Sequence, residues 1–431
     1  MIIFRNSTVM KLPHLVYANN KGEIFDHPYL KMSVRSAEYD FLPYDTELIP
    51  LPPSSRLYFM PHTRAMGFNT EKSRFETPDN SHAVSVFLPP AYLRLFLPSY
   101  KKLNNDTMPL FAYTAVGWLD GRFVVPSVKI DDDSHWKPDL YDYTDNFRPK
   151  VEYFLKRFPN NRLYKQLSRC ALEYHCTAAK NVFYPRWECP IPTAPACNSR
   201  CLGCISLQES ECCPSPQERI SFIPTPEEIA DVACVHAEHA EEPIISFGQG
   251  CEGDPLFAAD NIAEAIKLIR KRFPKLTINF NSNCSIPDKV AKVIDAGADS
   301  IRVSLNSVIP STYNAYYRPK GYTFDDVCRS IKTANERGCY VSLNLLIMPG
   351  INDRKSEVDA LICFLSKYRA ELIQTRNLNI DADILNSALK LPKDEILSIK
   401  NMLRLIKKEH KHIKYGYFNR TRDDFFTERK V

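Results

Sequence analysis

The sequence predicts an α/β protein in which parallel strands follow an N-terminal α+β module rich in β-hairpins. From about residue 185 onward, short apolar runs alternate with amphipathic segments at helical spacing. Before about residue 165, the apolar runs are short, rich in Pro, Tyr and Phe, and separated by turn residues. Strands that alternate with helices pair in parallel through right-handed crossovers, whereas strands joined by tight turns pair as antiparallel hairpins.

Residues 1–165 are predicted to form an accessory module with two recognisable hairpins. The first hairpin turns at 19–22, and the second turns at Asp120-Gly121, a dipeptide favoured in tight hairpin turns. An acidic run follows at 130–136, and we interpret it as a solvated loop rather than a metal site. No catalytic constellation is recognisable in this module. Its position in the chain suggests that it could close the open side of the domain that follows.

Residues 166–390 are predicted to form the core domain, with six strand–helix units. Apolar runs predict strands at 243–248, 277–283, 300–307, 340–350 and 371–380, and one more strand before a cluster of cysteines. Amphipathic segments predict helices at 148–172, 260–273, 286–297, 323–338 and 356–368. Six such units suit an incomplete α/β barrel or an open doubly wound sheet. Either architecture places the functional site at the carboxyl ends of the strands.

The charge of the chain is concentrated at its C-terminus. The 431 residues carry a formal net charge of +5, and residues 401–431 alone contain nine Lys or Arg and four Asp or Glu. Residues 391–431 are therefore predicted to form a basic helix and tail, more typical of a solvated face than of a surface for nucleic acid or an acidic partner. The sequence has no apolar run long enough to span a membrane, and polar residues interrupt 1–17, so a cytoplasmic location is expected.

Three of the fourteen cysteines form a compact motif. A chain of this size without an export signal is expected to use clustered cysteines for metal binding or catalysis rather than for disulfides. Cys197, Cys201 and Cys204 have the spacing C-x3-C-x2-C in a loop after the first predicted strand of the core. Three thiolates in one loop can hold three irons of a cubane and leave the fourth iron open. Zinc is the alternative, with Cys212 or Cys213 as a fourth ligand, although zinc sites usually use paired C-x2-C units.

The triad and its position after a strand resemble the radical S-adenosylmethionine (radical SAM) superfamily. The resemblance covers about residues 185–385 and implies a partial (β/α)6 TIM-like barrel. It implies that Cys197, Cys201 and Cys204 bind a 4Fe-4S cluster, whose open iron is chelated by S-adenosylmethionine. Reductive cleavage of this cofactor to a 5′-deoxyadenosyl radical, which abstracts hydrogen from a substrate, is the activity that the resemblance implies.

Further segments resemble the family's cofactor-binding motifs. "GQGCEGDPL" at 248–256 is similar to the Gly-Gly-Glu-Pro segment that holds the methionine amino group, and "NSN" at 281–283 stands in the place of a Thr-Asn-Gly segment. "RVSLNS" at 302–307 resembles the fourth strand, whose polar residues face the ribose or carboxylate, and Arg318 matches a position that pairs with the methionine carboxylate. The cofactor-binding residues implied are Gly250, Glu252, Gly253, Asp254, Asn283, Ser304, Asn306 and Arg318. The glycines could equally serve tight turns alone.

The sequence departs from the family pattern beside the third cysteine. Gly203 stands where the family usually has an aromatic residue that packs near the adenine, so the adenine needs another wall or a closer loop. Cys251, next to the cofactor segment, is a candidate catalytic hydrogen-atom donor or covalent partner, with a buried small residue as the alternative. The other cysteines form no compact second motif, which argues against an auxiliary cluster.

Three functional hypotheses remain from the sequence. The first is a radical SAM enzyme that modifies a peptide, a protein or RNA, motivated by the large N-terminal module and the basic tail. The second is a glycyl-radical-enzyme activase, although activases are usually shorter. The third is a non-catalytic iron-sulfur or zinc protein used for sensing or binding. The enzyme hypotheses imply an electron donor such as flavodoxin or ferredoxin, and the sequence does not identify the substrate.

Overall fold

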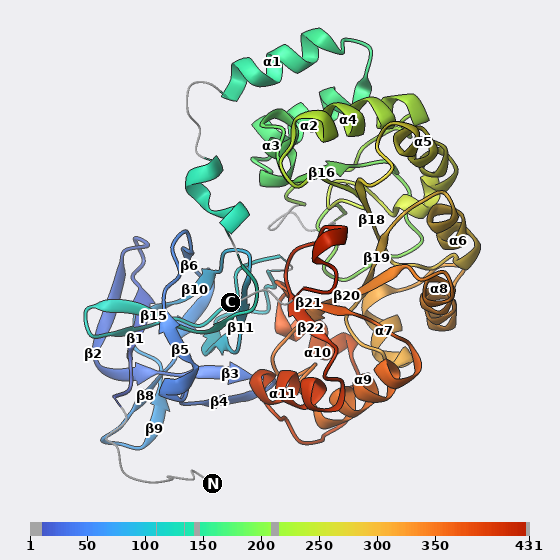
Figure 1. Cartoon of the computed structure of the whole chain (residues 1–431). Coiled ribbons are helices and arrows are strands. Elements are labelled where there is room, and N and C mark those ends of the chain that lie inside the picture. The colour runs from blue at the N-terminus through green and yellow to red at the C-terminus, as the bar shows by residue number, and fades with distance from the viewer. Residues whose placement is uncertain (1–10, 109, 133, 142–146, 208–214, 428–431) are drawn as a thin grey trace.

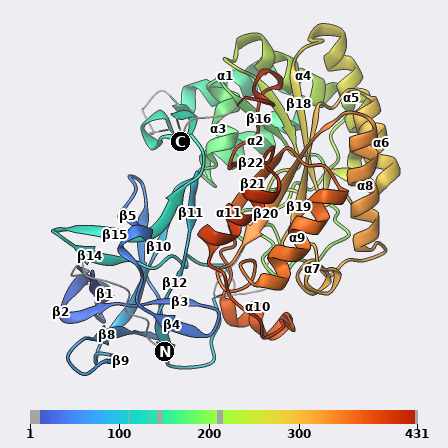
Figure 2. The same cartoon turned by 60° about the horizontal axis from the view of Figure 1, so that its bottom comes forward.

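The computed structural model describes residues 11–427, apart from 109, 133, 142–146 and 208–214. It consists of a β-rich N-terminal module and a larger α/β half-barrel, which lie side by side in both views (Figures 1 and 2). No helix within the described ranges is long and apolar enough to cross a membrane.

The half-barrel is a sheet of seven parallel strands that follow one another in chain order. The strands are β16 (Glu188–Ile191), β17 (Ile244–Phe247), β18 (Thr277–Ser282), β19 (Ser300–Leu305), β20 (Tyr340–Ile347), β21 (Leu372–Asn377) and β22 (Lys414–Gly416). The first six strands confirm the prediction, including the strand before the cysteine cluster. The seventh strand, β22, was not predicted, because three residues are too few to carry a periodic apolar signal.

Helices cover the outer face of this sheet (Figure 2). They are α4 (Pro226–His239), α5 (Ala259–Arg272), α6 (Pro287–Asp295), α7 (Pro310–Tyr317), α8 (Phe324–Glu336), α9 (Lys355–Lys367), α10 (Ala382–Ala388) and α11 (Ile399–Glu409). The four helices predicted between the strands are present as α5, α6, α8 and α9. The sequence reading missed α4, although the Thr225 side chain and Glu228 form a capping box at its start.

The helix predicted at 148–172 is two helices in the structure. They are α1 (Phe147–Arg157) and α2 (Arg162–Leu172), and α3 (Thr177–Phe183) follows them. Pro159 lies in the break, and Asn161 begins the second helix by accepting a hydrogen bond from the amide of Leu163. The single-helix prediction was wrong because an apolar period can continue in register across a short break that proline and an N-cap impose.

The N-terminal module is built from short antiparallel strands, ten of which belong to one sheet. They are β1 (His14–Ala18), β2 (Ile24–Met32), β3 (Val34–Ser36), β4 (Tyr39–Phe41), β5 (Leu48–Pro50), β6 (Arg56–Phe59), β7 (Thr63–Ala65), β8 (Gly67–Asn69), β9 (Arg74–Glu76), β10 (His82–Phe87), β11 (Tyr92–Arg94), β12 (Leu97–Pro98), β13 (Tyr100–Lys102), β14 (Gly117–Leu119) and β15 (Arg122–Lys129). Both predicted hairpins are present, as β1–β2 and β14–β15. Asp120 and Gly121 both have positive φ, as a tight hairpin turn requires.

The N-terminal module docks on the carboxyl ends of β20 and β21 through Arg94. This side chain is fully buried, and its Nη1 donates to Asn379 Oδ1 at 2.8 Å while its Nη2 donates to the carbonyl of Leu378. The backbone amide of Arg94 donates to Asn377 Oδ1 at 2.9 Å. Burial lowers the pKa of Arg94 to about 9. The module therefore stands at the edge of the barrel where the functional site is expected.

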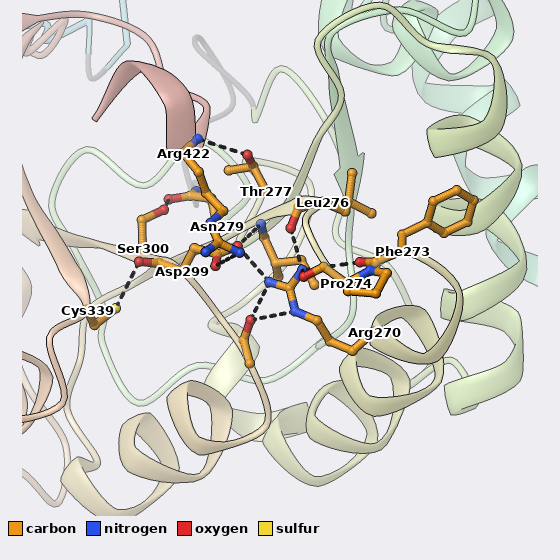
Figure 3. Close-up of polar contacts among 12 residues, drawn as sticks. Arg270, Phe273, Pro274, Leu276, Thr277, Asn279, Asp299, Ser300, Cys339 and Arg422 are labelled. Carbon is orange, nitrogen blue, oxygen red and sulfur yellow. Dashed lines mark hydrogen bonds and ion pairs between the residues drawn. The ribbon is translucent and has the colours of Figure 1, made fainter. Parts of the chain in front are cut away.

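The C-terminal tail covers the opposite edge, at the amino ends of the strands. The amide of Arg422 donates to Thr277 Oγ1 at 3.0 Å, and its guanidinium lies 3.4 Å from Asp299, which also pairs with Arg270 (Figure 3). The ring of Phe425 stacks on Tyr340 with centroids 4.1 Å apart. Arg422 and Phe425 of the tail thus contact the amino ends of the strands, and the carboxyl ends remain as the functional edge.

Candidate functional site

The three cysteines of the motif lie in the loop that leaves the carboxyl end of β16. Cys197, Cys201 and Cys204 are all partly exposed. Most other described cysteines are buried, as expected for small apolar residues. The triad is therefore placed where the sequence predicted it, at the functional edge and within reach of a ligand.

Glu252, in the loop after β17, fastens the start of the triad loop. One carboxylate oxygen accepts hydrogen bonds from the amides of Thr193 at 2.7 Å and Ala194 at 3.0 Å, and from the Thr193 hydroxyl. The other oxygen accepts from the amide of Gln249 at 2.6 Å. Burial raises the pKa of Glu252 to about 7, against the lowering effect of these hydrogen bonds. The carboxylate joins two loops that carry the site.

The same two loops also run against each other through their backbones. The amide of Gly253 donates to the carbonyl of Ala194 at 2.6 Å, and the amide of Asp254 donates to the carbonyl of Ala196 at 2.8 Å. A Cβ on Gly253 would stand 2.0 Å from the Ala196 carbonyl oxygen, which no side chain can tolerate. Glycine is needed at position 253 for this close approach.

Asp254 connects these loops to the next strand. Its Oδ1 accepts from the Ser282 hydroxyl at 2.8 Å, and its Oδ2 accepts from the amide of Asn283 at 2.7 Å. Asn283 in turn donates through Nδ2 to Asn198 Oδ1 at 2.8 Å and to Ser199 Oγ at 3.1 Å. Asp254 and Asn283 thus form a polar chain that ends inside the triad.

The far side of the triad loop is held by the end of α7. The amides of Arg200 and Leu202 donate to the carbonyls of Tyr317 and Tyr316, each at 3.0 Å. The Tyr316 hydroxyl lies against Gly203, where a Cβ would be 3.0 Å from it. The space that an aromatic residue at position 203 would fill is therefore occupied by Tyr316.

The surroundings of the thiols oppose the formation of uncompensated thiolates. Burial raises the pKa of Cys197 to about 11, and the charge of Asp254 adds to this effect. Burial and the two neighbouring thiols raise the pKa of Cys201 well above its usual value. Such thiols bind as thiolates only where positive charge compensates them, and a metal centre supplies that charge.

Arg219 provides compensating charge that the sequence reading missed. Its Nη2 lies 3.5 Å from Cys204 Sγ, and its Nε donates to Ser206 Oγ at 2.9 Å. The guanidinium also lowers the pKa of Cys197 and Cys201, although less than burial raises them. Arg219 follows the triad at a distance in sequence that matches no motif, so only the fold identifies it.

The other residues predicted to bind the cofactor differ in their burial and in their neighbours. Gly250 lies against Gln217 and Ile205 of the loop that follows the triad. Ser304 is partly exposed on β19, and Asn306, just beyond the strand, is buried with its Oδ1 unpaired. Arg318 is an exposed residue with positive φ at the end of α7.

Cys251 is buried away from this group. Its thiol interacts with that of Cys170 on α2, which lies outside the triad loop. The catalytic role assigned to Cys251 therefore stays a prediction, as do the cofactor contacts of the residues above.

The three thiols of the motif are the donor set that a four-iron cluster with one open iron requires. Across the described ranges, no three or more His, Cys, Asp or Glu side chains are grouped to hold one metal ion. In a four-iron cluster, each of the three thiolates binds a different iron, so the thiols do not have to surround one ion. Cys212 and Cys213, the suggested fourth zinc ligands, lie outside the described residues. The unpaired Asn306 Oδ1 at the same edge is an acceptor without a protein donor, as a bound cofactor would require.

The comparison with protein families matches this part of the chain. Residues 191–362 match the family model described as the radical SAM superfamily. This chain carries a radical SAM domain. The match runs from the last residue of β16 into α9 and includes the triad and the strands β17 to β20. The cofactors of radical SAM domains are a 4Fe-4S cluster and S-adenosylmethionine.

Curated relatives share this domain at low identity. The FeMo cofactor biosynthesis protein NifB of Klebsiella pneumoniae is 25% identical over 177 residues, which cover 38% of this chain and 37% of that protein. The probable GTP 3′,8-cyclase of Methanosarcina mazei is 28% identical over 197 residues, which cover 44% of this chain and 54% of that protein. The chain thus spans about half or less of the length of these relatives.

Solved structures resemble the chain at a similar level. The FeFe-hydrogenase maturase HydG from Carboxydothermus hydrogenoformans has a TM-score of 0.38 and 13% identity, over 64% of this chain and 72% of that chain. Methylornithine synthase (PylB) has a TM-score of 0.37 and 13% identity, over 56% of this chain and 69% of that chain.

Replacing Arg219 with Gln is expected to lower the midpoint potential of the reconstituted cluster, on the order of tens of millivolts. The positive charge of Arg219 and its N–H donor to Cys204 both stabilise the reduced, more negative cluster. The substitution removes both, so the cluster becomes harder to reduce. A redox titration followed by electron paramagnetic resonance measures the shift. Arg404→Gln, on the exposed face of α11, is the matched control, and an unchanged potential in Arg219→Gln would contradict the assignment.

Proposed function

We propose that this protein is a radical SAM enzyme that binds a 4Fe-4S cluster through Cys197, Cys201 and Cys204. When bound, the cluster and S-adenosylmethionine supply reductive cleavage to a 5′-deoxyadenosyl radical, which abstracts hydrogen from a substrate. The observation that carries the proposal is the placement of three partly exposed cysteines in one loop, at the carboxyl ends of parallel strands and within a radical SAM domain.

The residues around the triad act mainly by fixing the loop. Glu252 and Asn283 connect the loop to β17 and β18, and the carbonyls at the end of α7 hold its other side. Ser304 and Asn306 are proposed to contact the cofactor, because both lie at the edge of β19 and Asn306 has a free acceptor. In this proposal, Glu252 and Asn283 position the loop, whereas Ser304 and Asn306 contact the cofactor.

The proposed substrate remains a peptide, a protein or RNA, and the proposed reductant is a small carrier such as flavodoxin or ferredoxin. The exposed side chains of Ile205 and Leu207 stand directly after Cys204 and offer an apolar contact for such a carrier. The N-terminal module, docked through Arg94, is proposed to restrict the access of water to the same edge.

The proposal is tested by anaerobic reconstitution with iron and sulfide, followed by an assay of 5′-deoxyadenosine formation under dithionite. The wild type is expected to form 5′-deoxyadenosine, whereas Cys197→Ala, Cys201→Ala and Cys204→Ala are each expected to fall to background. Cys363→Ala is the matched control, because Cys363 is an exposed cysteine on α9. A protein that loads the cluster and never cleaves the cofactor with several reductants would favour a sensor. Uptake of zinc in place of iron would overturn the proposal.

A further inference from the structure

Two arginines meet at one neutral acceptor inside the half-barrel. Arg302 on β19 and Arg376 on β21 both donate to the same oxygen, Gln374 Oε1, at 3.1 Å and 3.2 Å. Neither guanidinium forms an ion pair with any residue that the structure describes. The guanidinium of Arg376 also lies over the ring of Tyr417, with its carbon 3.7 Å from the ring centroid. Two cations therefore share one neutral acceptor.

The charges around this pair do not balance it. Burial lowers the pKa of Arg302 to about 9, and the nearby charge of Arg376 lowers it further, whereas Glu188 acts in the opposite direction. Glu188 itself accepts a hydrogen bond from Asn419 at 2.8 Å. Like charges that lie close together without an ion-pair partner are unfavourable, and an anion bound between them would relieve this repulsion.

The strand register places these side chains on the face that lines the barrel. Arg302 pairs with Ser342 in register and Ser304 pairs with Asn344, so these residues lie on one face of β19 and β20. Arg302 and Ser304 are partly exposed, whereas Ile301, Val303 and Leu305 between and beside them are buried. The inner face is therefore polar and reachable, and the outer face packs against the helices.

Two further polar atoms on this face are unused. Arg302 Nε and Asn344 Oδ1 are buried, and neither has a hydrogen-bond partner among the residues that the structure describes. An unpaired guanidinium nitrogen is a donor for an anion, and an unpaired amide oxygen is an acceptor for a hydroxyl or amino group. The two atoms lie on the neighbouring strands β19 and β20. Asn344 pairs with Ser304 and so lies nearer to the carboxyl ends of the strands than Arg302, which pairs with Ser342.

We propose that Arg302 and Arg376 bind an oxyanion of the substrate, a carboxylate or a phosphate, inside the barrel. Paired guanidiniums bind both groups through parallel N–H donors. An anion anchored there directs the rest of the substrate past Asn344 and Ser304 toward the triad at the carboxyl ends of the strands. That the anion is part of the substrate rests on the proposed function. That an anion binds between the two arginines does not.

The test uses the chain of 431 residues without added iron. Thermal unfolding and calorimetric binding are measured in sodium phosphate, sodium acetate and sodium chloride at equal ionic strength. The wild type is expected to bind phosphate or acetate, and the salt that binds identifies the anion. Arg302→Gln and Arg376→Gln are each expected to weaken this binding about 30-fold or more. Without the anion, both variants are expected to unfold at the same temperature as the wild type or higher, because repulsion is relieved.

Arg329→Gln, on the exposed face of α8, is the matched control and is expected to keep wild-type anion binding. A wild type that responds to neither anion beyond chloride overturns the inference, as do Arg302→Gln and Arg376→Gln variants with unchanged binding. Lower unfolding temperatures of both variants without anion indicate a structural role and also overturn it. Anion binding is also measured in reconstituted protein with saturating S-adenosylmethionine. If the cofactor displaces the anion, the two share one site, and the inference of a separate substrate site is overturned.

The outcome is distinguishable from failure of the proposed function. A wild type that binds the anion but forms no 5′-deoxyadenosine contradicts the radical SAM activity and leaves the anion site in place. A wild type that forms 5′-deoxyadenosine but binds neither anion contradicts this inference alone.

Discussion

Replacing Gly253 with Ala is expected to abolish cluster binding while most of the barrel stays folded. The new methyl group would stand 2.0 Å from the Ala196 carbonyl oxygen, and backbone cannot move aside as a flexible side chain can. The loop would have to separate, and the backbone hydrogen bonds from Gly253 to Ala194 and from Asp254 to Ala196 would be lost. The expected cost is about 2–4 kcal/mol, concentrated in the loop that carries the triad. Iron content after reconstitution is expected to fall close to background.

The measurement is iron and sulfide content together with the visible absorption of the reconstituted protein. Gly338→Ala is the control, because Gly338 has positive φ at the end of α8 but an added Cβ would meet nothing within 4 Å. That variant pays only backbone strain of about 1 kcal/mol and should load the cluster normally. Full iron content in Gly253→Ala would show that the two loops can separate without consequence for the triad.

Replacing Arg94 with Met is expected to uncouple the N-terminal module from the half-barrel. The substitution leaves Asn379 Oδ1 and the Leu378 carbonyl without their donor in a buried interface. Each buried acceptor that is left without its donor typically costs about 1–3 kcal/mol. Because Arg94 links the module to the half-barrel, we expect its loss to weaken the coupling between them, so that unfolding splits into two transitions, with the module as the earlier one.

Differential scanning calorimetry and limited proteolysis of the full chain test this expectation. Arg64→Met is the control, because Arg64 pairs on the module surface with Asp79, whose side chain is 89% exposed, and such pairs contribute little. A single cooperative transition in Arg94→Met, at the wild-type temperature, would mean that the module is held by other contacts.

The sequence predicted the half-barrel because its signals are local. Apolar runs of strand length located β17 to β21 to within a few residues, and the spacing of Cys197, Cys201 and Cys204 marked the loop after β16. A short strand such as β22 left no signal, and the break at Pro159 was hidden within a continuous apolar period. These failures share one cause, since periodicity needs several residues before it can be distinguished from chance.

The candidate site was only partly predictable, for a different reason. Residues next to the triad or within a recognisable segment, such as Asp254 and Asn283, could be named from the sequence. Arg219 and Tyr316 could not, because each reaches the triad from a segment without a motif. Arg94 contacts residues more than 280 positions away, which no local pattern records.

The sequence by itself determined which segments become strands and helices and which three thiols share a loop, because both depend on neighbours along the chain. Only the tertiary structure decided that the Glu252 carboxylate binds backbone amides of the triad loop and that the N-terminal module covers the ends of β20 and β21. It also decided that Arg302 and Arg376 share Gln374 on the inner face of the barrel. These contacts arise from strand order and register, which bring together side chains that are far apart in the sequence.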